Sequence, residues 1–117
     1  MLYRLLSFFL PIPSIARQAQ KKCIAHYTRM LDLTVEDILN NKEAPTSINC
    51  ALCSVYMKHT CKKCPIYLKT GRTLCVNTPY CSVTTKYKDV MYHGNKSLTA
   101  FQIAVHEEID FLKTLEC

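Results

Sequence analysis

The chain has 117 residues, 49% of them hydrophobic and 21% charged, with a net charge of +6 at pH 7. This length supports one domain with a modest core, and the hydrophobic fraction excludes a chain that is disordered by composition. The sequence holds only two glycines, which disfavours an all-β fold with many tight turns and favours helices.

The N-terminal segment, residues 1–10, is an apolar run that we expect to form a short helix on the core, ended by Pro11 and Pro13. Exposed, the same face would contact a membrane or a partner. The segment also resembles a weak signal peptide, and the acid-free first 31 residues resemble a transit peptide. No stretch has the roughly 18 apolar residues of a membrane span. We therefore expect an intracellular protein without membrane association, with export as the alternative.

Two helices are predicted before the cysteine-rich region. Ser14 can cap the first, which continues to about Met30. Its apolar residues recur at three- and four-residue steps: Ile15, Ala19, Cys23, Tyr27 and Met30. Thr34 and Asp37 have the spacing of a capping box, which predicts a short helix over residues 35–40. Residues 41–47 then form a linker.

Eight cysteines require an explanation, and most of them lie close together. Two Cys-x-x-Cys pairs and one later position make up the set Cys50, Cys53, Cys61, Cys64 and Cys75. Each pair makes a tight turn that aims two thiolates at one point, and Zn²⁺ prefers four soft ligands in a tetrahedron. We therefore predict one closed zinc site whose ligands are four of these five cysteines. An iron–sulfur cluster, or disulfides in an exported chain, would use the same residue type.

Other side chains are weaker ligand candidates. Cys23 and His26 lie three residues apart and could form half of a second metal site, although a buried core thiol explains Cys23 more simply. Cys81 lies in the first turn of a predicted helix and is expected to be a core thiol rather than a ligand. His59 is an alternative nitrogen ligand, but an exposed histidine is the simpler interpretation.

The C-terminal part predicts two more helices. Thr78 followed by Pro79 predicts a helix start, and this helix should end at Gly94. Ser97 can cap the last helix, whose apolar stripe comprises Leu98, Phe101, Val105, Ile109 (or Glu108), Leu112 and Leu115. The side chains expected to face water for the most part are Glu107, Glu108, Asp110 and Lys113.

The predicted fold is mainly α: a small helical domain stapled by a Cys₄ zinc-knuckle region, with little or no sheet. We expect a single domain over residues 1–117. N-terminal helices lie in 1–49, the metal-binding knuckle region is 50–76, and a helical pair occupies 78–117.

A basic segment coincides with the knuckle region, because no carboxylate occurs between Glu43 and Asp89. These cations either balance a zinc–thiolate cluster of net charge −2 or contact an anionic partner. The predicted binding surface combines them with tyrosines and comprises Lys58, Lys62, Lys63, Lys69, Arg72, Tyr56 and Tyr67.

Catalytic motifs are missing from the sequence. A closed Cys₄ site has no open coordination position and does not activate water. The chain has no HExxH, Walker A or GxSxG motif, and no H-x-E combined with P-C-x-x-C. We therefore expect a protein that is not an enzyme and has no small-molecule substrate.

The cysteine pattern, the Thr70-Gly71 turn, Thr78-Pro79-Tyr80 and the closing helix with Phe111-Leu112 resemble small cysteine-rich proteins of unknown function encoded by bacteriophages and prophages. The resemblance covers about Cys50 to Leu115 and leaves residues 1–48 uncovered. The family pattern carries the five predicted ligand cysteines but not Cys81. It implies a virus-encoded protein that acts in the bacterial host cytoplasm, and it supplies no reaction.

The leading expectation is a zinc-stabilised interaction protein that binds and blocks or redirects a host macromolecule. The partner would be a host protein or protein complex, in the transcription machinery or in defence. Nucleic-acid binding by the same basic surface is the alternative. A secreted, disulfide-rich effector is a third possibility.

Overall fold

The computed structural model describes residues 15–45, 50–56, 64–71, 75 and 77–115. Its elements are α2 (Ile15–Met30), α3 (Val35–Leu39), α4 (Ala51–Tyr56), α5 (Pro65–Thr70), α6 (Pro79–His93), the 3₁₀-helix η3 (Gly94–Ser97) and α7 (Leu98–Lys113). No strand occurs within these described ranges, which confirms the prediction of a mainly α protein.

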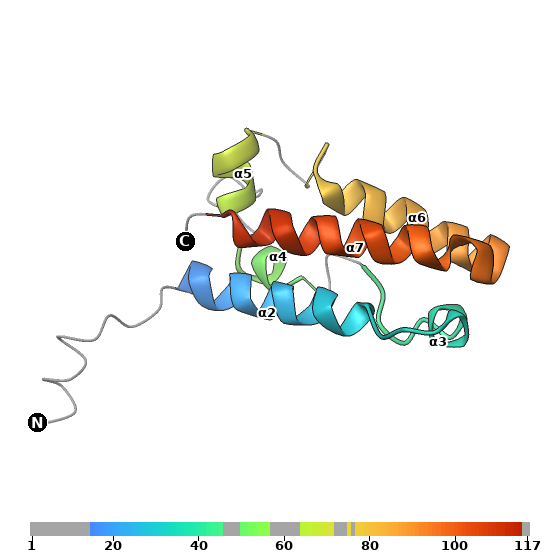
Figure 1. Ribbon diagram of the computed structural model, residues 1–117. Coiled ribbons are helices and arrows are strands. Elements are labelled where there is room, and N and C mark those ends of the chain that lie inside the picture. The colour runs from blue at the N-terminus through green and yellow to red at the C-terminus, as the bar shows by residue number, and fades with distance from the viewer. Residues whose placement is uncertain (1–14, 46–49, 57–63, 72–74, 76, 116–117) are drawn as a thin grey trace, which may run out of the picture.

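Three long helices form the body of the molecule. α6 and α7 pack against each other as a hairpin joined by η3, and α2 runs along the other side of α7 (Figure 1). The short helices attach to this frame, since α3 contacts α6 and α4 contacts α2. α5 lies beyond the C-terminal end of α7 (Figure 1). The beginning of the knuckle region is therefore held against α2.

The core lies between these helices. Its fully buried members include Met30 of α2, Val83 and Val90 of α6, and Phe101 and Leu112 of α7. Burying one such side chain contributes about 1.5–3 kcal/mol, so this apolar contact is the main source of stability for helices of this length. The stripes predicted for α2 and α7 are confirmed, except that Ile15 is 68% exposed at the first turn of α2.

The predicted helix boundaries are largely correct. The capping box of α3 is present, with the Asp37 amide donating to Thr34 Oγ1 at 3.1 Å and the Thr34 amide donating to Asp37 Oδ2 at 3.0 Å. α6 begins at Pro79 and ends before Gly94 as expected. Thr78 is the N-cap residue of α6 as expected, but its hydroxyl makes no capping hydrogen bond and donates instead to the Cys75 carbonyl at 2.7 Å. Ser97 likewise makes no side-chain cap on α7.

Several predictions lie outside the described residues: the helix over residues 1–10, the Ser14 cap, and residues 46–47 of the linker. The helices α4 and α5 were not predicted as separate elements, because six residues are too few for a periodic pattern. None of the helices in the described ranges combines the length and the apolar character needed to cross a membrane.

Candidate metal centre

Two thiols from distant parts of the chain meet in the core. Cys23 lies in the middle of α2, and Cys50 immediately precedes α4. Their Sγ atoms are 3.5 Å apart. Cys23 is completely buried and Cys50 is 8% exposed. The sequence interpretation of Cys23 as a buried thiol is confirmed, but its contact with Cys50 was not foreseen.

Backbone amides at the start of α4 point at these sulfurs. The Cys53 amide donates to Cys50 Sγ at 3.4 Å, and the Leu52 amide donates to Cys23 Sγ at 3.5 Å. The first amides of a helix have no carbonyl partner within the helix, so they are available to donate to a negatively polarised atom. Both sulfurs therefore sit where amide dipoles favour thiolate character.

The two thiols titrate unequally. Hydrogen bonds from the Cys23 and Cys53 thiols hold the pKa of Cys50 well below its ordinary value, against the opposing effect of burial. The hydrogen bond to Cys50 and burial raise the pKa of Cys23. Either sulfur can be the donor in their contact, and the opposite directions of the two pKa shifts make Cys50 the more acidic thiol of the pair.

Tyr80 of α6 senses several of these cysteines. Burial raises the pKa of the Tyr80 phenol, and the negative charges of Cys53, Cys75 and Cys50 add to this effect. The Tyr80 hydroxyl donates to the Pro45 carbonyl at 2.9 Å. Cys75 itself adopts a left-handed φ of 57°.

The predicted ligand set is only partly placed. Cys53 and Cys75 are half-buried and Cys64 is buried, whereas Cys61 lies outside the described residues. Among the side chains that the structure describes, no three of Cys, His, Asp or Glu converge on a point that could hold a metal ion. The Cys23–Cys50 pair by itself fits zinc, because Zn–S bonds of about 2.3 Å in a tetrahedron separate two sulfurs by about 3.8 Å.

Cys81 was predicted to be a core thiol, and this was wrong. Its side chain is exposed at the first turn of α6, where the thiol lies 3.4 Å from the Cys75 carbonyl. The alternative ligand His59 lies outside the described residues. Cys81 therefore lies outside the buried Cys23–Cys50 pair.

His26 is buried but takes part in an ion pair. Its Nδ1 lies 2.7 Å from Glu43 Oε1, and Arg29 Nη2 lies 2.9 Å from the same oxygen. Burial opposes ionisation of Glu43, but the hydrogen bonds from Arg29 and His26 outweigh it and hold the pKa of this carboxyl below its usual value. The bond to Glu43 uses only Nδ1, and His26 Nε2 has no hydrogen-bond partner within the described part of the chain. The second metal site considered for Cys23 and His26 is not assembled by the described residues, because no three potential ligands converge there.

Glu108 of α7 was expected for the most part to face water, with a place in the apolar stripe as the alternative to Ile109, and it is 2% exposed. Its Oε2 has no hydrogen-bond partner within the described part of the chain. Burial, and secondarily the charge of Cys50, raise the pKa of this carboxyl to about 7. The spacing offered a signal, because positions 101, 105, 108, 112 and 115 follow the alternating steps of four and three that mark the buried face of a helix.

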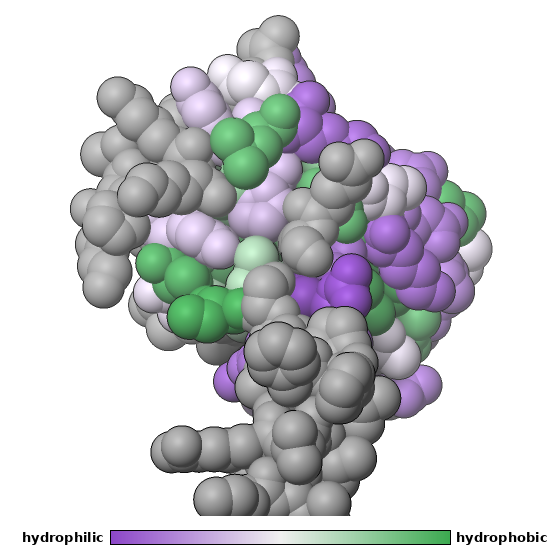
Figure 2. Space-filling model, turned by 90° about the vertical axis from the view of Figure 1, so that its left-hand side faces the viewer, coloured by the Kyte–Doolittle hydropathy of each residue, from purple (hydrophilic) through white to green (hydrophobic). Residues whose placement is uncertain are grey.

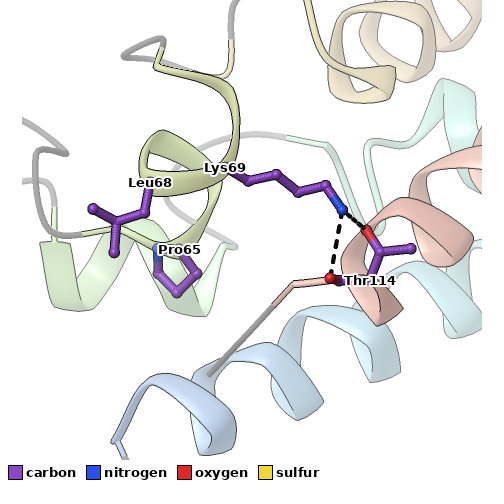
Figure 3. Close-up of a pocket in the computed structure, with 4 residues that line it drawn as sticks. All are labelled: Pro65, Leu68, Lys69 and Thr114. Carbon is purple, nitrogen blue, oxygen red and sulfur yellow. Dashed lines mark hydrogen bonds between the residues drawn. The ribbon is translucent and has the colours of Figure 1, made fainter.

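The part of the predicted binding surface that is described lies on α4 and α5. Lys69 Nζ donates to Thr114 Oγ1 at 2.6 Å and lies 3.4 Å from the Thr114 carbonyl, so it caps the C-terminal end of α7 (Figure 3). A pocket of about 340 Å³ is lined by Pro65, Leu68, Lys69 and Thr114. The lysine is therefore exposed but engaged within the protein.

The tyrosines of this surface are less accessible than expected. Tyr56 and Tyr67 are half-buried and pack against the core. Leu68 is 70% exposed, and this end of the molecule presents hydrophobic and hydrophilic residues side by side (Figure 2). The other predicted contacts, Lys58, Lys62, Lys63 and Arg72, lie outside the described residues.

Comparisons of the chain with protein-family models, with curated proteins and with solved structures find no match. The resemblance of residues 50–115 to cysteine-rich phage and prophage proteins therefore stays a prediction. The features that bear on function are the contact between the buried thiols of Cys23 and Cys50 and the exposed surface of α5.

Proposed function

We propose that the protein is a zinc-stabilised, non-enzymatic interaction protein that acts in a bacterial host, where it binds a host protein complex and blocks or redirects it. The observation that supports this most is the buried contact between Cys23 and Cys50, at 3.5 Å, with backbone amides donating to both sulfurs. A metal ion is the partner that two such sulfurs accept without leaving a negative charge uncompensated in the core.

We prefer zinc over an iron–sulfur cluster and over disulfides. A structural zinc ion has no open position and adds stability to a domain with a modest core. Four of Cys50, Cys53, Cys61, Cys64 and Cys75 were predicted as its ligands. In this proposal the ion anchors the short helices α4 and α5, which on their own are too short to persist in water.

The proposed contact surface is the knuckle region with α5. Leu68 is exposed there beside Lys69, and Tyr67 is half-exposed next to them. Interfaces favour such aromatic and apolar residues at the centre with charges at the rim. The carboxylate-free segment from Ala44 to Lys88 supplies positive charge around this centre, which favours an acidic protein surface as partner.

Elemental analysis of the full chain, purified under reducing conditions, tests the zinc part and should give one zinc per chain.

Binding to immobilised bacterial RNA polymerase then tests the partner. Triple charge reversal of Lys62, Lys63 and Arg72 to Glu should weaken this binding at least tenfold, whereas reversal of the exposed Lys96 in η3, outside the knuckle region, should not. Equal binding by both variants would remove the knuckle region from the proposal.

Nucleic-acid binding is the second candidate, supported by the same carboxylate-free segment. A protein that neutralises phosphates loses affinity steeply with salt, because counterions are released on binding. A mobility shift of single-stranded oligonucleotides that disappears between 50 and 200 mM salt, a range typical for such tests, would favour this candidate. A secreted effector would instead show fewer reactive thiols than the eight cysteines of the sequence when counted without reduction and without metal.

A further inference from the structure

We infer that Cys23 of α2 is a ligand of the metal centre and shares the ion with Cys50. The sequence-based ligand set contained only cysteines between residues 50 and 75, so Cys23 takes one of the four places assigned to them. The inference rests on the proposed zinc site and concerns only the two thiols whose contact the structure describes.

The distance between the sulfurs carries the argument. Two residues that are 27 positions apart in the sequence bring their Sγ atoms to 3.5 Å. Tetrahedral coordination requires about 3.8 Å between adjacent sulfurs, so a small outward movement admits an ion. Cys23 lies on the buried stripe of α2 between Ala19 and Tyr27, and its side chain is already aimed at the start of α4.

The amides provide a second, independent observation. The Leu52 amide donates to Cys23 and the Cys53 amide donates to Cys50, so each sulfur has its own backbone donor from the same helical turn. Hydrogen bonds from outside the coordination shell orient ligands and tune the site.

A consequence for the fold follows from this assignment. If Cys23 binds the ion, the metal joins α2 directly to the knuckle region instead of closing a local loop. α2 also packs along α7, and Gln20 Nε2 donates to the Leu112 carbonyl at 2.6 Å, so α2 connects the ion to the C-terminal helix. The metal centre then organises the three-helix body.

The direct test uses the full wild-type chain loaded with ¹¹³Cd. Proton-detected correlation through the coupling between ¹¹³Cd and cysteine Hβ atoms identifies each ligand. We expect one ¹¹³Cd signal that correlates with the Hβ atoms of both Cys23 and Cys50. A signal that correlates with four other cysteines would overturn this inference while the proposed zinc site stands. Failure to bind ¹¹³Cd or zinc at all would overturn both.

Variants give a second measurement. Zinc affinity, measured by competition with a chromogenic chelator, should fall more than about tenfold in Cys23→Ser and in Cys23→Ala, since even loss of a hydrogen-bonding neighbour of a ligand has effects of about that size. Cys81→Ser is the matched control and should bind zinc like the wild type, because Cys81 is exposed and outside the pair. Cys23→Ala keeps an apolar side chain, so a helical Cys23→Ala variant with wild-type affinity would overturn the inference. Isolation of the native protein with a Cys23–Cys50 disulfide would overturn it as well.

Discussion

The hydroxyl of Tyr87 in α6 lies 2.8 Å from the side-chain oxygen of Asn41, which follows α3. The same hydroxyl is 3.3 Å from the Ile38 carbonyl. Asn41 adopts a left-handed φ of 56°, a conformation that asparagine tolerates better than most residues. This contact fixes the end of α3 on α6.

Replacement of Tyr87 by Phe removes this hydrogen bond and leaves the aromatic contact with Phe101, whose ring centroid is 5.8 Å away. We expect a loss of about 1 kcal/mol in the free energy of unfolding, measured by urea denaturation. Tyr92→Phe is the control, because Tyr92 is 82% exposed and should unfold like the wild type. Equal unfolding midpoints for both variants would contradict a role for the Tyr87 hydroxyl.

Burial of Glu108 predicts a dependence of stability on pH. The pKa of Glu108 is raised from 4.5 to about 7 in the fold, so the neutral carboxyl is the form that the core accepts. Its contribution to stability is fully present below pH 4.5 and is lost as the pH rises through 7. The shift corresponds to about 3 kcal/mol when the ionisation is complete.

Glu108→Gln keeps the shape of the side chain and removes its titration. This variant should be more stable than the wild type at pH 8, and the difference should shrink toward pH 5. Urea unfolding at both pH values measures the change. Glu107→Gln is the matched control on the exposed side of α7 and should follow the wild type. A Glu108→Gln variant that loses stability with rising pH as steeply as the wild type would contradict the assignment.

The capping box of α3 provides a prediction about local stability. Thr34→Ala removes the side-chain oxygen that accepts the Asp37 amide at 3.1 Å, and we expect a loss of about 1 kcal/mol in the free energy of unfolding. Thr84→Ala is the comparison, since the hydroxyl of the half-buried Thr84 only donates to a carbonyl within α6, the Cys81 carbonyl at 2.9 Å. A smaller effect at position 34 than at position 84 would contradict the importance of the cap.

Local signals predicted much of the fold. Apolar periodicity located α2 and α7, Thr34 and Asp37 located α3, and Pro79 with Gly94 bounded α6. These features depend on residues within a few positions of one another, so the sequence displays them directly. Glu108 was misplaced because its charge was weighted above its spacing. The core tolerates a buried carboxyl when it is protonated, and whether it is protonated depends on the folded environment.

The candidate metal centre was predicted less completely. The Cys-x-x-Cys pairs predicted a metal site made of cysteines, but no local pattern connects Cys23 with Cys50, which lies 27 residues later. That contact depends on how α2 packs against α4, and such tertiary packing leaves no periodic trace in the sequence. The exposure of Cys81 has the same origin, since the hydrophobic character of cysteine alone did not reveal which face of α6 is covered.

Metal removal should loosen one part of the molecule more than another. α4 has six residues and contacts α2, whereas α6 and α7 are long and pack against each other (Figure 1). Helices shorter than about 12 residues are marginal without tertiary support, so α4 should depend on the proposed ion if its first turn helps to bind it. After chelation, hydrogen exchange measured by mass spectrometry should accelerate at least tenfold in peptides covering α4 and the Cys23 turn of α2. Peptides of the α6–α7 hairpin should change less.

The exposed-site variant Cys81→Ser should respond to the chelator like the wild type. Equal acceleration across all helices would mean that the ion stabilises the fold only globally, and no acceleration anywhere would mean that these thiols hold no structural metal.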